Sequence, residues 1–412
     1  MGVLRAPDVL LPDFSRVDAS KWAVIACDQF TSEPGYWEQA DACVGDSPST
    51  LRLMLPEVYL SQAKERIPGI QKTMQEYLGA GLLKERKGTY IYVERVQSDG
   101  FVRKGLVVSV DLEAYAFEAG SQSPVRATEK TVLERIPPRV RIREGAALEM
   151  PHVMLLADDP ENRLFDVVTS HLGEKLYDCD LMLGGGHLTG YAVDPSAYDR
   201  IGEIVDSYGT ENTYGKAPLS LAVGDGNHSL ATAKTAYERI KQEIGQKAAE
   251  SHPARFAMCE IVNLHDPALR FEPIYRVMFR VDPRDVAHAF RDYAKKLNGQ
   301  AEAQEVTFVT GKSEEAVLVP HPEQQLVVGT VQTFIDGYLS SHSGAEVDYI
   351  HGEDSVRELT RPADTFGFLF QGMQKNELFK TVILDGSLPR KTFSMGHARD
   401  KRYYMEAHRI VP

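Results

Sequence analysis

Apolar and polar positions alternate in short runs along much of the first half of the chain, and stretches with helical spacing separate these runs. Thr89–Val96 and Phe101–Leu112 are β-rich runs joined by Gln97–Gly100, which ends in Asp-Gly. An Asp-Gly corner between alternating apolar runs is a strong signal for a β-hairpin. Lys21–Ala26 is a further expected strand. Tyr59–Leu78 has the spacing of a helix, which Pro68 should break or kink.

The clearest succession of strand, loop and helix lies between residues 219 and 246. Leu219–Val223 is an apolar run that predicts a strand, and a loop with the sequence GDGNHS follows it. The helix after this loop extends to about Gln246. Its expected buried stripe has three- and four-residue spacing and consists of Leu230, Ala233, Tyr237 and Ile240.

Strands that alternate with amphipathic helices predict a mixed α/β protein. A length of 412 residues is enough for two or three domains. No repeat or linker-like run marks a boundary, so residues 1–208 and 209–412 are the expected domains, with a soft division at the loop of residues 209–218.

The composition narrows the classes of function. With 43% hydrophobic and 25% charged residues the chain is typical of a globular protein, and the net charge of −13 disfavours binding to nucleic-acid phosphates. The four cysteines include no CxxC pair, so they predict neither a structural zinc site nor a disulfide framework. No apolar run approaches the roughly 18 residues of a membrane span, and the first residues lack a signal-peptide core. We therefore expect a soluble cytoplasmic protein.

The GDGNHS loop carries the best candidate chemistry. Gly224 and Gly226 let the backbone turn sharply and approach a ligand closely. The first amides of the following helix, with the positive end of its dipole, then form a site for an anion such as phosphate. Asp225 has the chemistry of a base or metal ligand, and His228 that of a proton donor or acceptor. The alternative interpretation is plain turn and capping chemistry, in which no ligand takes part.

Several other polar residues are weaker candidates for the substrate side of a site. Asp28 follows a predicted strand, His187 follows three glycines in a predicted hinge or hairpin, and His351 precedes an acidic helix start. Arg139, Arg141 and Arg143 alternate with apolar residues, as on a solvated strand face; the alternative is a groove for an acidic ligand. The histidines show no zinc-protease spacing, and no P-loop or protein-kinase signature occurs.

The sequence resembles the domain-of-unknown-function 1015 family. GDGNHS and the alanine-rich helix after it resemble the family signature A-D-G-H-H-R. Further segments agree in the same order, among them VDASKWAVIACDQF, DPALRFEPIYRV, DYIHGED and LPRKTF. The family is often described as similar to chromosome-partitioning ParB proteins, and its D-G-x-H segment is similar to the ParB and sulfiredoxin-like fold.

This resemblance implies a ParB/sulfiredoxin-like nucleotide-binding core with an additional mixed α/β domain. It also implies ATP, ADP or another nucleotide as ligand, with Mg²⁺ as the ion. Asp225, Gly226 and His228 match the signature, whereas Asn227 and Ser229 stand where a histidine and an arginine are usual. The hydroxyl of a serine cannot clamp a phosphate as a guanidinium does.

Two further positively charged residues are carried over from the resemblance. Arg276 matches the arginine of the family's P-T-H-R element, and Lys391 matches a lysine near the end of the family pattern. Both are expected to neutralise phosphate charge, while Gly224, Gly226, Asn227 and Ser229 form the cradle.

Three functions remain open at this point. The first is a phosphotransferase, kinase or nucleotide hydrolase that acts on a small molecule, with Asp225 and His228 as its catalytic residues. The second is a regulatory module that senses a nucleotide or metabolite without turning it over. The third, a DNA-partitioning factor, is disfavoured by the negative charge and by the lack of a basic recognition helix.

Overall fold

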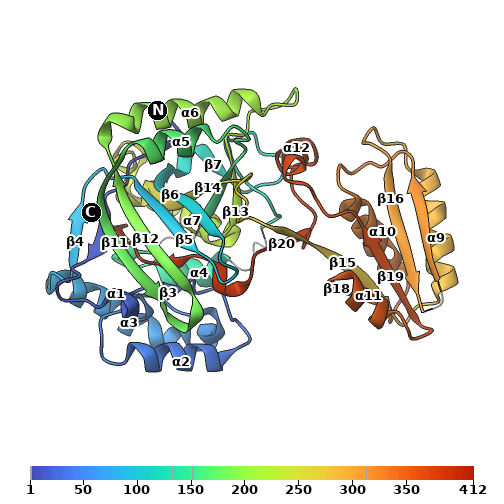
Figure 1. The fold of residues 1–412 in the computed structure, drawn as a ribbon, viewed down its shortest axis with the longest axis horizontal. Coiled ribbons are helices and arrows are strands. Elements are labelled where there is room, and N and C mark those ends of the chain that lie inside the picture. Colours follow the sequence, from blue (N-terminus) through green and yellow to red (C-terminus); the bar gives the residue numbers. More distant parts are fainter. Residues whose placement is uncertain (1, 132–133, 135, 151–152, 312) are drawn as a thin grey trace. The chain divides into compact units, whose positions relative to one another are not determined.

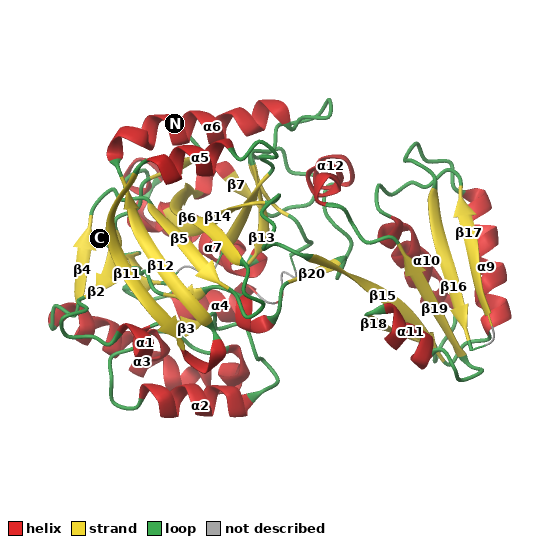
Figure 2. Cartoon of the chain, viewed as in Figure 1, coloured by secondary structure: helices red, strands yellow, loops and turns green. Residues whose placement is uncertain are grey.

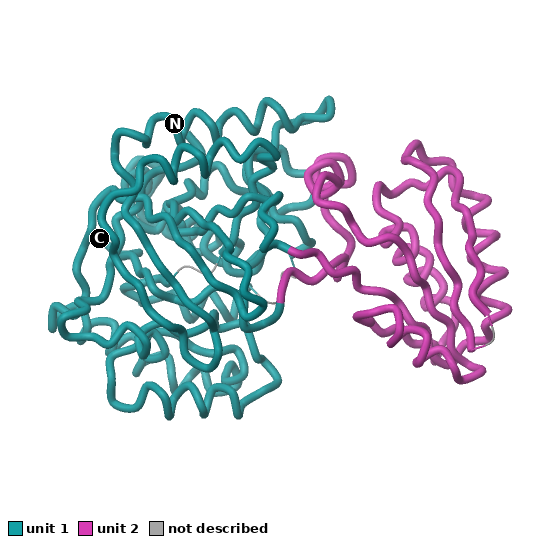
Figure 3. Tube along the Cα trace, viewed as in Figure 1, with its two compact units in different colours: residues 1–269, 397–412 teal, residues 270–396 magenta. Residues whose placement is uncertain are grey.

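The chain folds into two compact units (Figure 3). Each unit has its own β-sheet. The structure is a computed structural model that describes residues 2–131, 134, 136–150, 153–311 and 313–412. Unit 1 comprises residues 1–269 and 397–412, and unit 2 comprises residues 270–396. The predicted mixed α/β class is confirmed (Figure 2). The expected division at residue 208 falls inside helix α6 (Tyr198–Glu211) of unit 1, because the chain after this helix re-enters the same sheet as β13 (Leu221–Asp225).

A ten-stranded mixed sheet forms the centre of unit 1 (Figure 1). Its strands are, in sheet order, β11 (Leu172–Leu181), β12 (Gly186–Val193), β5 (Ile91–Val96), β6 (Val102–Asp111), β14 (Phe256–Asn263), β10 (Met154–Ala157), β13, β8 (Val125–Ala127) and β7 (Tyr115–Ala116), while β1 (Leu4–Arg5) pairs with β6. The pairs β10–β14, β13–β8 and β7–β8 are parallel, and the others are antiparallel. The β5–β6 pair confirms the predicted hairpin.

Helices cover both faces of this sheet. Neighbouring residues of one strand point to opposite faces, so Tyr92 joins one apolar cluster and Ile91 joins the other. The helices of unit 1 are α1 (Ala19–Trp22), α2 (Pro34–Val44), α3 (Ala63–Gly79), α4 (Ile136–Arg143), α5 (Arg163–Ser170), α6, α7 (Asn227–Ile244) and α8 (Gln246–Ala249). Residues of α5, α6 and α7 belong to the cluster of Tyr92, and residues of α1, α2 and α3 to the cluster of Ile91.

The last residues of the chain return to unit 1 and pair with three of its early segments. The short two-stranded sheets are β3 (Val24–Ile25) with β21 (Tyr403–Tyr404), β9 (Leu148–Glu149) with β22 (His408–Arg409), and β2 (Val9–Pro12) with β4 (Leu83–Arg86). A bridge also joins Leu10 to Ala407. The C-terminal residues are therefore part of the same core as the N-terminal helices.

Two local predictions hold only in part, since Val24–Ile25 of the predicted strand is β3 and a kink of α3 at Pro68 stays a prediction. The strand expected over Lys21–Ala26 begins as helix α1, because the Asp18 side chain accepts a hydrogen bond from Ser20 N and caps a helical turn. Pro68 does not break α3. It lies in the second turn, where the missing N–H leaves only a carbonyl of the first turn without a helical partner.

Unit 2 is a six-stranded antiparallel sheet with helices on its faces. Its elements are β15 (Phe271–Phe279), α9 (Pro283–Lys296), β16 (Gln304–Thr310), β17 (Ser313–Val319), α10 (Val327–Ser341), β18 (Glu346–His351), α11 (Glu353–Leu359), β19 (Thr365–Phe370), α12 (Lys375–Asp385) and β20 (Phe393–Met395). Phe290, Phe308, Phe334 and Phe368 pack ring against ring between α9, α10 and the sheet. None of the helices within the described residues combines the length and apolar character that a membrane span requires.

Candidate functional site

The GDGNHS loop joins β13 to α7, as predicted. Gly226 has the left-handed backbone conformation, with φ +80°, and takes the N-cap position without any side-chain hydrogen bond to the first turn. A side chain at Gly226 would be strained in this conformation. The N-cap residue therefore offers no side chain to the backbone amides of the first turn, and a helix start with such amides attracts an anion.

Gly224 serves packing within the sheet. A Cβ atom at this position would lie 2.7 Å from Cγ of Leu156 on the neighbouring strand β10. The side chain of Leu156 thus occupies the space that a side chain at position 224 would need. Of Gly224 and Gly226, it is the backbone conformation of Gly226 that determines how α7 begins.

Asn227 holds the loop against the end of β8. Its Oδ1 accepts a hydrogen bond from Thr128 N at 3.1 Å, and its Nδ2 donates to Thr128 Oγ1 at 3.3 Å. Thr128 Oγ1 in turn donates to the carbonyl oxygen of Val223 at 2.6 Å. The amide side chain therefore fixes the first turn of α7 relative to two strands.

Asp225 lies beside a positive charge that the sequence analysis missed. Its Oδ2 forms an ion pair with Nζ of Lys401 at 3.3 Å, and its Oδ1 accepts a hydrogen bond from Gly226 N at 3.0 Å. Both charged side chains are largely buried, with 24% and 17% of their surface exposed. The run of charged residues at 399–402 was the available signal, but nothing in the sequence indicates that it returns to this loop.

His228 and Ser229 follow in the first turn of α7, and both are partly buried. Thr232 Oγ1 donates a hydrogen bond to the carbonyl oxygen of His228 at 2.7 Å. Ser229 lines a cavity that continues into the apolar interior of unit 1. The first turn thus connects the candidate anion site with this cavity.

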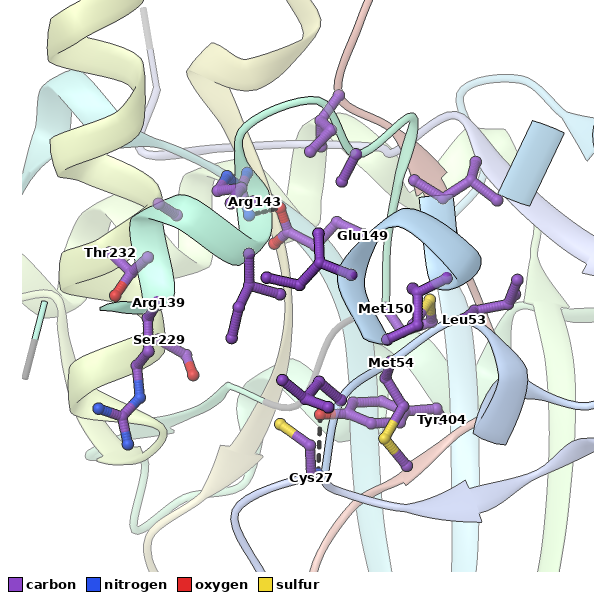
Figure 4. Close-up of a pocket in the computed structure, with 18 of the residues that line it drawn as sticks. Cys27, Leu53, Met54, Arg139, Arg143, Glu149, Met150, Ser229, Thr232 and Tyr404 are labelled. Atoms are coloured by element: carbon purple, nitrogen blue, oxygen red, sulfur yellow. Dashed lines mark hydrogen bonds and ion pairs between the residues drawn. The ribbon is translucent and has the colours of Figure 1, made fainter. Parts of the chain in front are cut away.

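The cavity has a volume of about 160 Å³ and lies among α3, α4, α7 and the 3-10 helix η2 (Glu57–Gln62). Figure 4 shows Arg139 and Ser229 on one side, Arg143 and Glu149 on another, and Cys27 and Tyr404 on a third. Arg139 is paired with Glu57, and Arg143 with Glu149.

The arginines at 139 and 143 are one helical turn apart, so the strand face suggested by their alternation was wrong. The segment contains Pro137 and Pro138 in the first turn of α4, where the missing N–H groups have no helical partner to lose. Arg139 and Arg143, four residues apart, consequently face the same cavity.

Cys27 is a poor candidate for a nucleophile. Burial raises the pKa of its thiol to about 12, and the thiolate is the reactive form. Its backbone N–H donates to the hydroxyl of Tyr404 at 3.1 Å. Asp28, the next residue, accepts a hydrogen bond from Gln29 Nε2 at 3.0 Å.

Arg276 and Lys391 belong to unit 2. All five N–H groups of the Arg276 side chain donate to acceptors of that unit, which are the side chain of Gln332 and the carbonyl groups of Ile274, Tyr275, Arg390 and Lys391. Burial lowers the pKa of Arg276 to about 10. Nζ of Lys391 lies 4.9 Å from the centre of the Tyr349 ring. These contacts hold Arg276 within unit 2, and the expected contact of Arg276 and Lys391 with phosphate stays a prediction.

His187 lies on a strand of unit 1 that is not next to the GDGNHS loop, and His351 belongs to unit 2. His351 is an exposed residue at the end of β18 in unit 2. His187 is on β12, which is separated from β13 by the strands β5, β6, β14 and β10. The predicted hairpin before His187 is present as β11 and β12.

We expect His187 to titrate above pH 6.5. Hydrogen bonds to Asp180 at 2.8 Å and Asp178 at 2.7 Å favour the protonated ring, against a smaller effect of burial, and raise its pKa. Because the folded-state pKa is the higher one, this stabilisation is complete below about pH 6.5 and is lost as the pH rises through the folded pKa. NMR titration of the imidazole tests this, and Asp180→Asn should lower the pKa. A wild-type pKa of 6.5 or less contradicts the assignment.

The loop residues could bind a metal ion only if a bound nucleotide supplied further ligands. No cluster of three or more His, Cys, Asp or Glu side chains that could hold a metal ion occurs in the described parts of the chain. Mg²⁺ is commonly bound through one or two carboxylates together with substrate phosphates and water. Asp225 alone fits that role.

The chain belongs to the family described as protein of unknown function (DUF1015), whose family model matches residues 13–338. No curated protein matches the sequence.

Three solved structures are similar to parts of the chain. A conserved hypothetical protein from Pyrococcus furiosus has 10% identity and a TM-score of 0.33, over 70% of this chain and 93% of that one. A free serine kinase variant in complex with AMP has 11% identity and a TM-score of 0.36, over 70% and 90%. SbnI from Staphylococcus aureus, truncated at its C-terminus, has 10% identity and a TM-score of 0.32, over 74% and 82%. Similarity at this level does not define a shared activity.

Proposed function

We propose that unit 1 binds the phosphate groups of a nucleotide, such as ATP or ADP, at the start of α7 and acts as a phosphotransferase on a small molecule. The observation that carries this proposal is the start of α7 at Gly226, where the N-cap residue has no side chain between the first turn and a ligand. The helix dipole and the backbone amides of the first turn favour a bound anion there. Lys401 adds a positive charge beside the same loop.

In this proposal each residue of the loop has a separate role in binding the nucleotide. Gly226 and the first-turn amides, with the side chains of Asn227 and Ser229, hold phosphate oxygens. Lys401 compensates their charge. Asp225 acts as the base or, as the alternative, would bind a nucleotide-borne Mg²⁺. Transfer of a phosphoryl group depends mainly on such positioning and charge neutralisation.

In the transfer step, the oxygen of the acceptor hydroxyl forms a bond to the terminal phosphorus of the nucleoside triphosphate. The bond from that phosphorus to the bridging oxygen breaks, and the nucleoside diphosphate leaves. Asp225 takes the hydroxyl proton, and His228 contacts the transferred phosphate. With water as the acceptor, the same arrangement gives nucleotide hydrolysis.

A second candidate is a sensor that binds the nucleotide without turning it over. The ion pair between Asp225 and Lys401 favours this reading, because it occupies the carboxylate that would take the proton or the metal ion. Ser229 also provides a hydroxyl in place of the guanidinium usual in the family signature.

One series of measurements separates the two functions. The thermal midpoint of the full chain is measured with ATP, ADP and other nucleotides, each with and without Mg²⁺. Nucleotides that stabilise the protein are then assayed for release of phosphate or ADP with small hydroxyl compounds as acceptors. Binding with turnover supports the phosphotransferase, binding without turnover supports the sensor, and no stabilisation by any nucleotide contradicts both.

A further inference from the structure

The cavity beside Ser229 has the size and lining of a site for an apolar group. Its wall is formed largely by aliphatic side chains, among them Leu53, Leu60, Ile67, Ile70, Met74 and Ile142. Its volume of about 160 Å³ is close to that of engineered apolar cavities of roughly 150 Å³, which stay dry and bind benzene. A ligand body of roughly six carbon atoms is therefore the matching size.

The charges along the cavity wall are already balanced. Among the described lining residues, the charged side chains are two arginines and two glutamates, joined as the pairs Arg139–Glu57 and Arg143–Glu149. A charged ligand would lose its hydration when it enters the cavity. These ion pairs offer it no unpaired opposite charge in return. The lining thus favours a neutral molecule.

Among the described residues of this wall, one buried donor lacks an acceptor. Nη2 of Arg143 is shielded from solvent and makes no hydrogen bond within the described residues. A buried donor without a partner is costly, and in native proteins such groups usually have one. An oxygen atom of a bound ligand would supply the missing acceptor at this end of the cavity.

The other polar end of the cavity is formed by the first turn of α7. Ser229 lines the cavity and belongs to the proposed phosphate cradle, and Thr232 follows it one turn later. A hydroxyl group of a molecule in the cavity would thus lie next to the proposed site of phosphoryl transfer.

From these observations we infer that the cavity binds the acceptor substrate, a small neutral alcohol. It has an apolar body of roughly six carbon atoms, its reacting hydroxyl group at Ser229 and a second oxygen atom at Arg143. The acceptor role rests on the proposed function, because the nucleoside triphosphate supplies the phosphoryl group in the step described above. Binding of the alcohol itself does not depend on it.

The test uses three six-carbon probes with the full-length protein and no nucleotide. Hexane-1,6-diol is neutral with two oxygen atoms, hexan-1-ol is neutral with one, and adipate carries two negative charges. We expect the diol to bind, hexan-1-ol to bind more weakly, and adipate to bind at least tenfold more weakly than the diol, as measured by calorimetry or ligand-observed NMR. Failure of the diol to bind, or adipate binding as tightly as the diol, overturns the inference.

Variants that fill the cavity give the second arm. Ala233→Leu places a larger side chain on the cavity wall, and Ala146→Leu does so from another side, should the first variant fold poorly. Each should weaken binding of the diol at least tenfold, whereas Ala248→Leu, an exposed position of α8, should leave it unchanged. Unchanged binding in the folded cavity variants overturns the inference.

Nucleotide binding by the same proteins separates this inference from the proposed function. Diol binding that is lost in the cavity variants, together with nucleotide binding that is retained, supports both. If nucleotide binds and the diol does not, the inference fails and the proposed function stands. If the diol binds and no nucleotide does, the acceptor role fails with the proposed function, and the cavity remains a ligand site.

Discussion

Replacing Glu260 by alanine is expected to lower the free energy of unfolding of unit 1 by about 3–5 kcal/mol, the usual cost of removing one partner from a buried ion pair. Glu260 lies on β14 with only 1% of its surface exposed. It is paired with Arg402, and its Oε1 lies 3.7 Å from Nε of Arg103. Without the carboxylate, Arg103 and Arg402 lose their shared counter-charge, and Arg402 keeps only its pair with Glu406 at 2.7 Å.

The charge state of Glu260 shows which effect dominates. Burial on its own would raise the pKa of this carboxyl, but Arg402 and Arg103 outweigh it and the pKa is lowered. Such a group contributes stability above its unfolded pKa of about 4.3, and this stability is lost as the pH falls through the folded pKa. The difference in the free energy of unfolding between the wild type and Glu260→Ala should thus become smaller at acid pH.

Urea unfolding of the wild type and Glu260→Ala measures the difference. Glu243→Ala, on the exposed side of α7, is the matched control and should change the free energy of unfolding by less than about 0.5 kcal/mol. A loss of under about 1 kcal/mol for Glu260→Ala would mean that the buried network is not a main source of stability.

Gly105 provides an independent check on the position of this carboxylate. A Cβ atom at Gly105 would lie 2.1 Å from Oε1 of Glu260. Gly105→Ala should therefore destabilise the wild type more than it destabilises the Glu260→Ala variant, since neighbours that share space do not act additively. Equal effects in both backgrounds would place the carboxylate elsewhere.

Replacing Asp225 by asparagine is expected to reduce nucleotide turnover by about 10²–10⁴-fold, the usual contribution of a general base. Asparagine keeps an oxygen that can accept the hydrogen bond from Gly226 N, so the loop should keep its conformation. It cannot take a proton from an acceptor hydroxyl, and it no longer pairs with the charge of Lys401.

Rates of phosphate or ADP release from the wild type and Asp225→Asn measure this effect, with circular dichroism to confirm the fold. Asp46→Asn makes the same change of charge at an exposed site and should leave the rate unchanged. Turnover by Asp225→Asn equal to that of the wild type would remove Asp225 from the catalytic role.

The parts of the fold that were predicted from the sequence are those set by local signals. The Asp-Gly corner at residues 99–100 fixes the β5–β6 hairpin, and the apolar run followed by GDGNHS fixes the β13–α7 junction. Both depend on residues within a few positions of one another. Helix α4 was missed because three arginines at every second position match a strand, while the prolines before them permit a helix.

The remainder depends on pairing between distant segments. Lys401 reaches Asp225 only because the C-terminal residues return to unit 1 through β21 and β22. The cavity combines residues from near Cys27, from α3, α4 and α7, and from the end of the chain. Neither arrangement follows from residue spacing, because no local pattern states which segments meet.

The central claim is that the first turn of α7 binds a nucleotide phosphate, and the affinity for ADP of Asn227→Asp tests it most directly. The aspartate keeps the acceptor for Thr128 N but loses the 3.3 Å hydrogen bond to Thr128 Oγ1. The helix dipole favours its charge, yet that negative charge lies beside the bound phosphate. Gln246→Glu, at an exposed position beyond the other end of α7, adds the same charge as a control. We predict that calorimetry will show ADP binding at least tenfold weaker for Asn227→Asp and unchanged for Gln246→Glu. Equal affinity in the wild type and Asn227→Asp would contradict the account.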